Sequence, residues 1–515
     1  MSPLAGGARG AYGRPGCAVN FRFVVHTFGC QMNAHDSDRM AGVLRAAGGV
    51  AVETEQDADL VVFNTCSVRE KAEQKLRSAV GKLAPLKRER PDLVIAVAGC
   101  VAQQEGEALL ARVRHIDLVV GPDNIAELPA LLMEQMAGAP PTARTEFDTA
   151  APRFLTWTPP EDQAGHGGLR TARSPVVGLV TTMKGCDERC SFCVVPYTRG
   201  PERYRSARDI VEEVRRFVDA GAREVLLLGQ TVDSFRDDAL PLPEHDDLGP
   251  RGADAPYDGD ATQFPHLLRL IAREVPASRG LARLRYTSPH PRHATASLAR
   301  VHAEVDVLAR HVHLPVQSGS DRVLRRMIRR YTRAEYVARA ERLMRARPGL
   351  TLSTDVIVGF PGETEDDFAQ TLSLVREVGF VSLFGFKYSA RPHTPALRLV
   401  DDVPEEVKSD RLARLFAVAE EMGAAHLARL VGTDQKVLVE GPSKSERGDL
   451  SHDRVQGRSE RNEIVHVHGP GAGSLVGQVV EVTVTRAHRH SLSAELVSPL
   501  SAPRRAEPMR RLPVW

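Results

Sequence analysis

The stretch Cys186-Asp-Glu-Arg-Cys190-Ser-Phe-Cys193 decides the fold of this 515-residue chain. Its three cysteines lie so close in sequence that their thiolates can converge on one metal centre without a long loop. Zinc is the main alternative, but structural zinc sites usually take four ligands in paired spacing, and no fourth partner is near. Three thiolates suit a [4Fe–4S] cluster that leaves one iron open for a substrate or cofactor.

The sequence downstream of Val176 alternates short apolar strands with helices. Strands are predicted at 176–181, 224–229, 283–287, 312–316, 352–358 and 383–388. Helices are predicted between them at 207–220, 264–273, 294–308, 320–347 with a break near Tyr331, and 365–378. Six βα units are too few for an eight-stranded barrel, so we predict an open, partial (βα)6 barrel. The cysteines follow its first strand, and parallel barrels have their active sites at the C-terminal ends of their strands.

Three other cysteines each follow directly on a strand of an upstream α/β segment. The strands are predicted at 21–27, 59–64, 92–98 and 116–120, with helices at 34–47, 68–86, 102–113 and 125–136. Cys30, Cys66 and Cys100 are 36 and 34 residues apart, about one βαβ unit each. In a parallel sheet these strand ends share one edge, which is where open α/β sheets bind ligands. Each cysteine alone could be an inert buried thiol, but together they predict a second [4Fe–4S] cluster.

The pattern changes after Pro404. A charged helix at 405–430 precedes short strands without helices between them, at 435–440, 463–468, 476–485 and 493–496. These strands predict a small all-β barrel. The α/β chain is therefore divided into a leader 1–20, an N-terminal parallel-sheet domain 21–137, a linker 138–174, the barrel with its trailing helix 175–431, a β-domain 432–498 and a tail 499–515. The polar stretch 236–263 is predicted to be a surface insertion.

Composition excludes several classes of protein. The 68 Lys and Arg nearly balance the 66 Asp and Glu, so the chain is neither polycationic nor acidic overall. No uncharged apolar run reaches the roughly 18 residues that span a membrane, and the leader lacks the apolar core of a signal peptide. Seven cysteines, an odd and sparse set, argue against a disulfide scaffold. We expect a cytoplasmic monomer, in which the seventh, Cys17, is a free thiol without a role.

The three-then-two cysteine spacing resembles the signature of the radical S-adenosylmethionine (SAM) enzymes. The later strand ends carry matching motifs: Gly229-Gln230 resembles the family's contact to the methionine end of SAM, and the run from Val356 to Glu363 its adenine motif. Each glycine-rich turn alone is commonplace, but their order at consecutive strand ends is specific. The resemblance implies SAM contacts from Phe192, Gly229, Gln230, Gln317, Ser318, Val358 and Gly359.

The order of the three domains resembles the methylthiotransferases among these enzymes. The segment Thr27-Phe-Gly-Cys30-Gln31-Met32-Asn33 is similar to the branch that acts on tRNA N6-isopentenyladenosine. Further matches lie at 313–320, 327–333 and 388–396. The run Arg199-Gly-Pro-Glu-Arg-Tyr204-Arg205 departs from the usual pattern in having Tyr204 where a serine is common. Another departure is His393, where glycine is usual.

This resemblance implies methylthiolation of C2 of N6-dimethylallyladenosine at position 37 of tRNA. It implies two [4Fe–4S] clusters, held by Cys30, Cys66 and Cys100 and by Cys186, Cys190 and Cys193. One SAM would yield a radical and a second would donate the methyl group, while an electron donor and a sulfur donor would come from outside. The alternatives are a ribosomal-protein methylthiotransferase, against which Gln31-Met32-Asn33 argues, and a non-catalytic iron–sulfur RNA sensor.

Two basic segments are candidates for contact with the anticodon stem-loop. The first, 321–330, carries Arg322, Arg325, Arg326, Arg329 and Arg330, although charge alone favours an ordinary solvated helix face. The second is the C-terminal β-domain, which by resemblance is a TRAM domain, a small RNA-binding barrel. Its basic residues are Arg454, Arg458, Arg461, Arg486, His488, Arg489 and His490. Such local patches would bind phosphates in a salt-dependent way.

Overall fold

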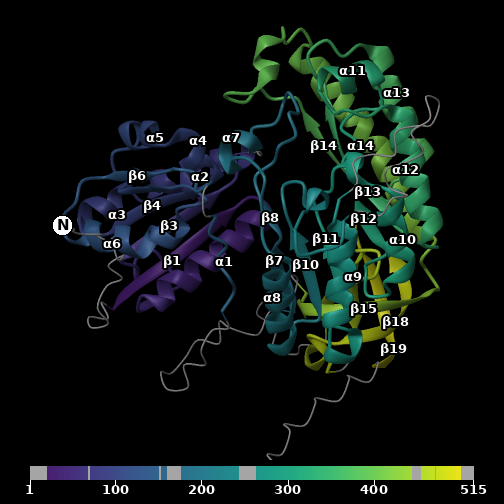
Figure 1. Ribbon diagram of the computed structural model, residues 1–515, viewed down its shortest axis with the longest axis horizontal. Coiled ribbons are helices and arrows are strands. Elements are labelled where there is room, and N and C mark those ends of the chain that lie inside the picture. Colours follow the sequence, from purple (N-terminus) through teal and green to yellow (C-terminus); the bar gives the residue numbers. More distant parts are fainter. Residues whose placement is uncertain are drawn as a thin grey trace, which may run out of the picture.

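The computed structural model describes residues 20–67, 70–149, 152–158, 176–242, 262–443, 454–469 and 471–499. Three folded parts follow one another along the chain (Figure 1). The predictions made for the leader up to 19, for Cys17, for most of the insertion and for the tail from 500 lie outside the described residues. Among the described residues, no helix is long and apolar enough to cross a membrane.

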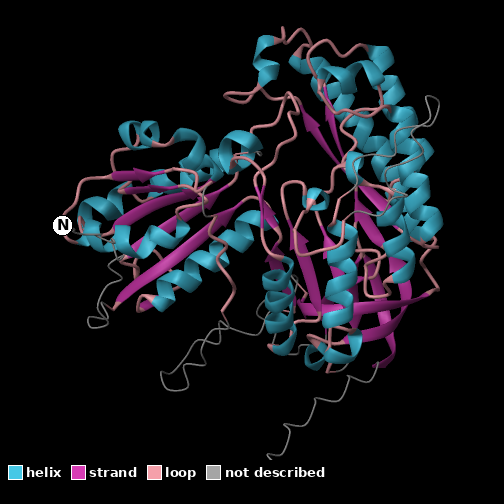
Figure 2. Cartoon of the chain, viewed as in Figure 1, coloured by secondary structure: helices cyan, strands magenta, loops and turns pink. Residues whose placement is uncertain are grey.

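The N-terminal domain is a six-stranded, fully parallel sheet in the order β2-β1-β3-β4-β5-β6. Its strands are β1 (Phe21–Phe28), β2 (Gly49–Ala51), β3 (Leu60–Thr65), β4 (Val94–Gly99), β5 (Leu118–Val120) and β6 (Thr142–Arg144). Its helices are α1 (Gln31–Ala46), α2 (Glu70–Lys82), α3 (Ala84–Glu89), α4 (Cys100–Glu105), α5 (Glu107–Arg112) and α6 (Leu128–Met136). Both β3 and β4 are buried along their whole length, because helices cover the sheet on both faces (Figure 2).

Two short strands of this sheet were not predicted. Three residues, as in β2 and β6, are too few to produce a periodic pattern. The second of them, β6, lies in the segment interpreted as a linker and pairs in parallel with β5. In the same segment Trp157 is buried and stacks on Phe217 of the central domain, with ring centroids 4.2 Å apart. Residues 142–144 and Trp157 are thus packed parts of the fold.

The central domain contains the predicted six parallel strands, arranged as an open partial barrel. Sheets β7-β10-β11 and β12-β13-β14 are joined by a parallel bridge between Leu284 and Leu308. The strands are β7 (Val177–Thr181), β10 (Glu224–Leu228), β11 (Arg283–Tyr286), β12 (His311–His313), β13 (Thr351–Val358) and β14 (Ser382–Lys387), with a small antiparallel pair β8 (Met183–Lys184) and β9 (Arg203–Tyr204). The helices are α7 (Val195–Arg199), α8 (Ala207–Asp219), α9 (Phe264–Glu274), α10 (Ala296–Glu304), α11 (Asp321–Arg326), α12 (Arg333–Ala346), α13 (Glu365–Val378) and α14 (Glu405–Ala428).

The C-terminal domain is a closed barrel in the order β15-β16-β17-β19-β18. Its strands are β15 (Asp434–Pro442), β16 (Arg454–Ser459), β17 (Ile464–His468), β18 (Val479–Ala487) and β19 (Leu492–Pro499). Sequence reasoning missed β16, because it has little apolar content. This barrel lies against the N-terminal ends of the central strands: Arg283 donates to the carbonyl of Arg458 at 3.2 Å and Arg285 to that of Ser459 at 2.9 Å. It is therefore at the opposite end from the strand ends that precede the cysteines (Figure 1).

Candidate active site

The three N-terminal cysteines lie at one edge of the sheet, as predicted from their spacing. Cys30 caps α1 just after β1, Cys66 follows β3, and Cys100 begins α4 directly after β4. These three strands are neighbours in the sheet. The backbone at Gly29 has φ +145°, and a Cβ there would lie 2.6 Å from the Cβ of Cys66. Glycine at position 29 therefore lets the backbone next to Cys30 lie against the side chain of Cys66.

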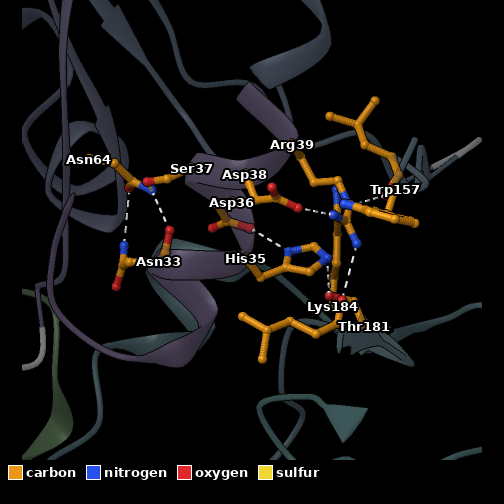
Figure 3. Close-up of polar contacts among 12 residues, drawn as sticks. Asn33, His35, Asp36, Ser37, Asp38, Arg39, Asn64, Trp157, Thr181 and Lys184 are labelled. Carbon is orange, nitrogen blue, oxygen red and sulfur yellow. Dashed lines mark hydrogen bonds and ion pairs between the residues drawn. The ribbon is translucent and has the colours of Figure 1, made fainter. Parts of the chain in front are cut away.

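Within this N-terminal triple, the pKa values of Cys30 and Cys100 are shifted in opposite directions. A hydrogen bond with Cys66 lowers the pKa of Cys30 to about 6, whereas burial raises the pKa of Cys100. The Cys30 sulfur also lies 3.4 Å from Oδ1 of Asn33. Asn33 is held in turn by Asn64, through hydrogen bonds of 3.1 and 2.8 Å (Figure 3). The Gln31-Met32-Asn33 segment therefore reaches the site through Asn33.

Cys186, Cys190 and Cys193 of the central domain, called the barrel triple below, lie on the loop between β8 and α7. Cys186 and Cys190 are buried, and Cys193 is half-buried. The Cys186 sulfur lies 3.0 Å from the hydroxyl of Thr231, which follows β10. Burial raises the pKa of Cys186 and that of Cys193, the latter to about 12. The thiols of Cys186 and Cys193 would therefore have to lose their protons on binding a metal.

Arg329 contacts the barrel triple and was not predicted to do so. Its guanidinium donates to the Cys190 sulfur at 3.2 Å and to the carbonyl of Pro315 at 3.1 Å. The flanking residues Ile328 and Arg330 have φ of +57° and +55°, a strained conformation for a β-branched residue. The strain turns Arg329 inward, where it is 5% exposed.

The prediction of one helix with a basic face over residues 321–330 is therefore wrong in part. The helix α11 ends at Arg326, and Arg329 belongs to the buried site. Arg322 forms an ion pair with Asp367, and Arg326 donates to the carbonyl of Pro361 at 2.9 Å. Helical periodicity could not reveal this outcome, because the chain leaves the helix before its last arginines.

Six of the seven residues expected to contact SAM lie at or after the C-terminal ends of β10, β12 and β13, and the seventh, Phe192, lies on the cysteine loop. Gln230 accepts a hydrogen bond of 2.6 Å from the backbone of Gly185, next to Cys186. Gln317 has φ +73°, and Gly359 has φ +68°. The Ser318 hydroxyl lies 3.3 Å from that of Thr371. Gly229 precedes Gln230, Val358 precedes Gly359, and Phe192 packs on the cluster of Val323, Met327, Phe360, Tyr388 and Ala396.

Buried polar contacts join the N-terminal domain to the central domain, which is called the barrel domain below (Figure 3). His35 of α1 lies 2.9 Å from the hydroxyl of Thr181, at the end of β7. Arg39, also on α1, forms a 2.8 Å ion pair with Glu213 of α8 and donates to the carbonyl of Leu179 at 3.1 Å. Arg39 is 3% exposed and Glu213 fully buried. Breaking such a buried ion pair is costly, so these contacts stabilise the docking of the two domains.

The two cysteine triples are joined by α7. This helix begins two residues after Cys193 and ends at Arg199, and it packs against α4, which Cys100 begins. The guanidinium of Arg199 donates to the Cys100 sulfur at 3.2 Å and to Asp36 at 2.7 Å. A residue of the barrel domain therefore reaches the N-terminal triple. Sequence reasoning missed this role, although it singled out the Arg199–Arg205 run.

The donor chemistry of both triples fits iron–sulfur clusters. Within the part of the chain that the structure describes, no three His, Cys, Asp or Glu side chains are close enough to share a single metal ion. A [4Fe–4S] cluster does not require that closeness, because each thiolate binds a different iron. Each triple offers three free cysteine sulfurs, and a buried guanidinium donates to one sulfur of each.

Comparison with known proteins gives consistent matches along the chain. Three family models match: Uncharacterized protein family UPF0004 at residues 22–121, the Radical SAM superfamily at 180–375 and the TRAM domain at 428–497. A tRNA-2-methylthio-N(6)-dimethylallyladenosine synthase from Sorangium cellulosum is 62% identical over 476 residues, covering 92% of this chain and 93% of that protein. A protein of the same description from Bordetella petrii is 43% identical over 479 residues, covering 92% and 91%. A solved radical SAM methyltransferase, TsrM from Kitasatospora setae, is 17% identical with a TM-score of 0.48, covering 82% of this chain and 81% of its own.

Proposed function

The chain belongs to the family of tRNA-2-methylthio-N(6)-dimethylallyladenosine synthases, and we propose that it adds a methylthio group to C2 of N6-dimethylallyladenosine at position 37 of tRNA. The observation that supports this proposal is the pair of cysteine triples, one in each of two domains, joined through α7 and Arg199. An aromatic C–H has no polar route to C–S–CH3 at neutral pH, so the cofactor must carry the hard chemistry.

The barrel triple would hold the cluster that acts on SAM. With SAM bound, such a cluster supplies a 5′-deoxyadenosyl radical. The chain's own residues hold and orient this group: Cys186, Cys190 and Cys193 are its ligands, while Thr231 and Arg329 contact two of their sulfurs. We assign the SAM contacts to Phe192, Gly229, Gln230, Gln317, Ser318, Val358 and Gly359, since all lie near these ligands or at the strand ends around them.

The N-terminal triple would hold a second cluster close to the substrate base. Cys30, Cys66 and Cys100 are its ligands, and Asn33 lies against the first of them. The site would present sulfur to the base, with a second SAM as methyl donor. The chain would act as a cytoplasmic monomer that takes electrons and sulfur from partners.

The tRNA would contact exposed basic residues of the C-terminal barrel. Arg486, His488, Arg489 and His490 are exposed around the turn between β18 and β19. Arg489 also pairs with Glu420, and further basic residues are paired within the chain, such as Arg458 with Glu440 and Arg461 with Glu463. Since this barrel packs on the far end of the central strands, the RNA would extend along the molecule, with its adenine turned out of the stack.

Iron and sulfide content after anaerobic reconstitution tests the cluster assignment. About eight irons per chain are expected for two [4Fe–4S] clusters, and about four for the Cys30→Ala, Cys66→Ala, Cys100→Ala triple variant. About four irons in the unaltered chain would overturn the proposal of two clusters. The loaded enzyme should modify isopentenylated tRNA and leave ribosomal protein unmodified; modification of protein alone would overturn the substrate assignment.

A further inference from the structure

The segment that follows the barrel cysteines, Arg199 to Arg205, reaches mainly across the domain boundary. Arg203 forms an ion pair with Asp123 of the N-terminal domain and donates to the carbonyl of Asp148 at 2.8 Å. Arg205 pairs with Glu213, which also binds Arg39 of the N-terminal domain. Arg199 differs from these two arginines, because one of its partners is a cysteine sulfur.

The buried guanidinium of Arg199 directs one donor at a carboxylate and another at a cysteine sulfur. The side chain is 4% exposed, and its one carboxylate partner, Asp36, is buried too. His35 lies 3.2 Å from the other oxygen of Asp36 and helps to orient it. Among the described residues, Asp36 is the carboxylate paired with this guanidinium, and the Nε–H donates to the Cys100 sulfur, 3.2 Å away. Hydrogen bonds to charged acceptors are stronger than those to neutral ones. The hydrogen bond from Arg199 is therefore strongest when Cys100 is a metal-bound thiolate.

We propose that Arg199 is a positioning residue of the N-terminal cluster, supplied by the barrel domain, and that it stabilises the reduced form of that cluster through the Cys100 sulfur. The inference rests on the two-cluster function proposed above. Hydrogen bonds to cluster sulfurs are among the determinants of reduction potential. The N-terminal site is then complete only when the barrel domain is docked, and α7 connects it directly to the ligand Cys193.

The test uses the full chain with Cys186, Cys190 and Cys193 replaced by alanine, so that only the N-terminal cluster forms. In this background Arg199→Met removes the donor and the charge, and Arg199→Lys keeps the charge. Arg391→Met is the matched control, because Arg391 pairs across the same domain boundary with Glu73 at 3.3 Å. The readouts are the rate of iron loss to a chelator and the midpoint potential from a redox titration followed by electron paramagnetic resonance.

Arg199→Met should lose iron about 10- to 100-fold faster than the background chain, as expected for loss of an outer partner of a metal ligand. Its midpoint potential should shift to more negative values, because the reduced cluster loses a positive partner. Arg199→Lys should recover part of both effects, and Arg391→Met should show neither. A potential and iron loss in Arg199→Met equal to those of Arg391→Met would overturn the inference.

The failure of the proposed function is distinguishable from this outcome. If the background chain itself holds no iron, the two-cluster proposal fails, whatever Arg199 does. If Arg199→Met does not fold, judged by circular dichroism of the apoprotein, then Arg199→Lys decides. An unchanged potential in that variant, whose amine lacks the planar fork of arginine, would overturn the inference, and a negative shift would support it.

Discussion

The two cysteine triples contain the same three side chains but are assembled from the chain in different ways. The N-terminal triple is assembled from three strands whose cysteines are more than thirty residues apart, whereas the barrel triple lies on one loop. A neighbouring thiol lowers the pKa of Cys30, while burial raises the pKa of Cys186 and Cys193. Each triple has one buried arginine on one sulfur, but Arg329 comes from the same domain as its cysteines and Arg199 from the other.

This difference indicates how each site depends on the rest of the chain. The barrel triple has its cysteines, Thr231 and Arg329 within one domain, so folding of that domain completes it. If Arg199 acts as we propose, the N-terminal triple also needs the docked central domain, since Arg199 and the buried contacts of α1 cross the boundary. On this proposal, the barrel site depends on the folding of its own domain, whereas the N-terminal site depends on both domains being docked.

The largest effect is expected from Cys190→Ala. It removes a barrel ligand and the acceptor of Arg329, leaving a buried guanidinium without that partner. Both 5′-deoxyadenosine release and methylthiolated tRNA should fall below detection, because no radical forms without the cluster. Chromatographic assay of both products checks this. Retained methylthiolation would show that the barrel triple is not the radical site.

A more selective loss is expected from Cys30→Ala, the matching change in the other triple. Methylthio transfer should be abolished, yet 5′-deoxyadenosine should still be released, because the barrel ligands are untouched. The same two assays, with iron content as a control for the remaining cluster, separate the roles. Equal loss of both products in the two variants would contradict the division of labour between the triples.

The barrel triple was the easier of the two to predict. Its three cysteines lie within eight residues, so their spacing in the sequence alone predicts that the thiols lie close together. The N-terminal triple required the strand positions first, and these were readable because β3 and β4 are continuous apolar runs. Arg199, Arg329 and Thr231 could not be assigned, because their roles depend on tertiary contacts between segments far apart in sequence. The same holds for β6 and β16, whose pairing comes from neighbours rather than from pattern.

A loss of stability tests the dependence of the N-terminal site on docking. Glu213→Gln leaves Arg39 and Arg205 buried without their shared carboxylate, and breaking a buried pair in this way costs about 3–5 kcal/mol. The neighbouring Glu212→Gln is the control, because its ion pairs are exposed and worth about 0–1 kcal/mol. Chemical denaturation of the apoproteins measures both. An equal cost for the two variants would show that this contact does not hold the domains together.

The smallest expected effect is a pH dependence of the same boundary, through His35. Burial is the main cause that lowers the pKa of His35 below its ordinary value, so the unfolded chain binds more protons than the folded chain as pH falls through about 6.5. The free energy of unfolding of the apoprotein should therefore decrease between pH 7.5 and pH 5. His302 in the barrel, whose pKa burial lowers to about 3, adds the same slope to every variant that retains it. The difference between the unaltered chain and His35→Gln isolates His35: the variant should have the shallower slope, and identical slopes would mean that the His35–Thr181 contact does not make the domain boundary sensitive to acid.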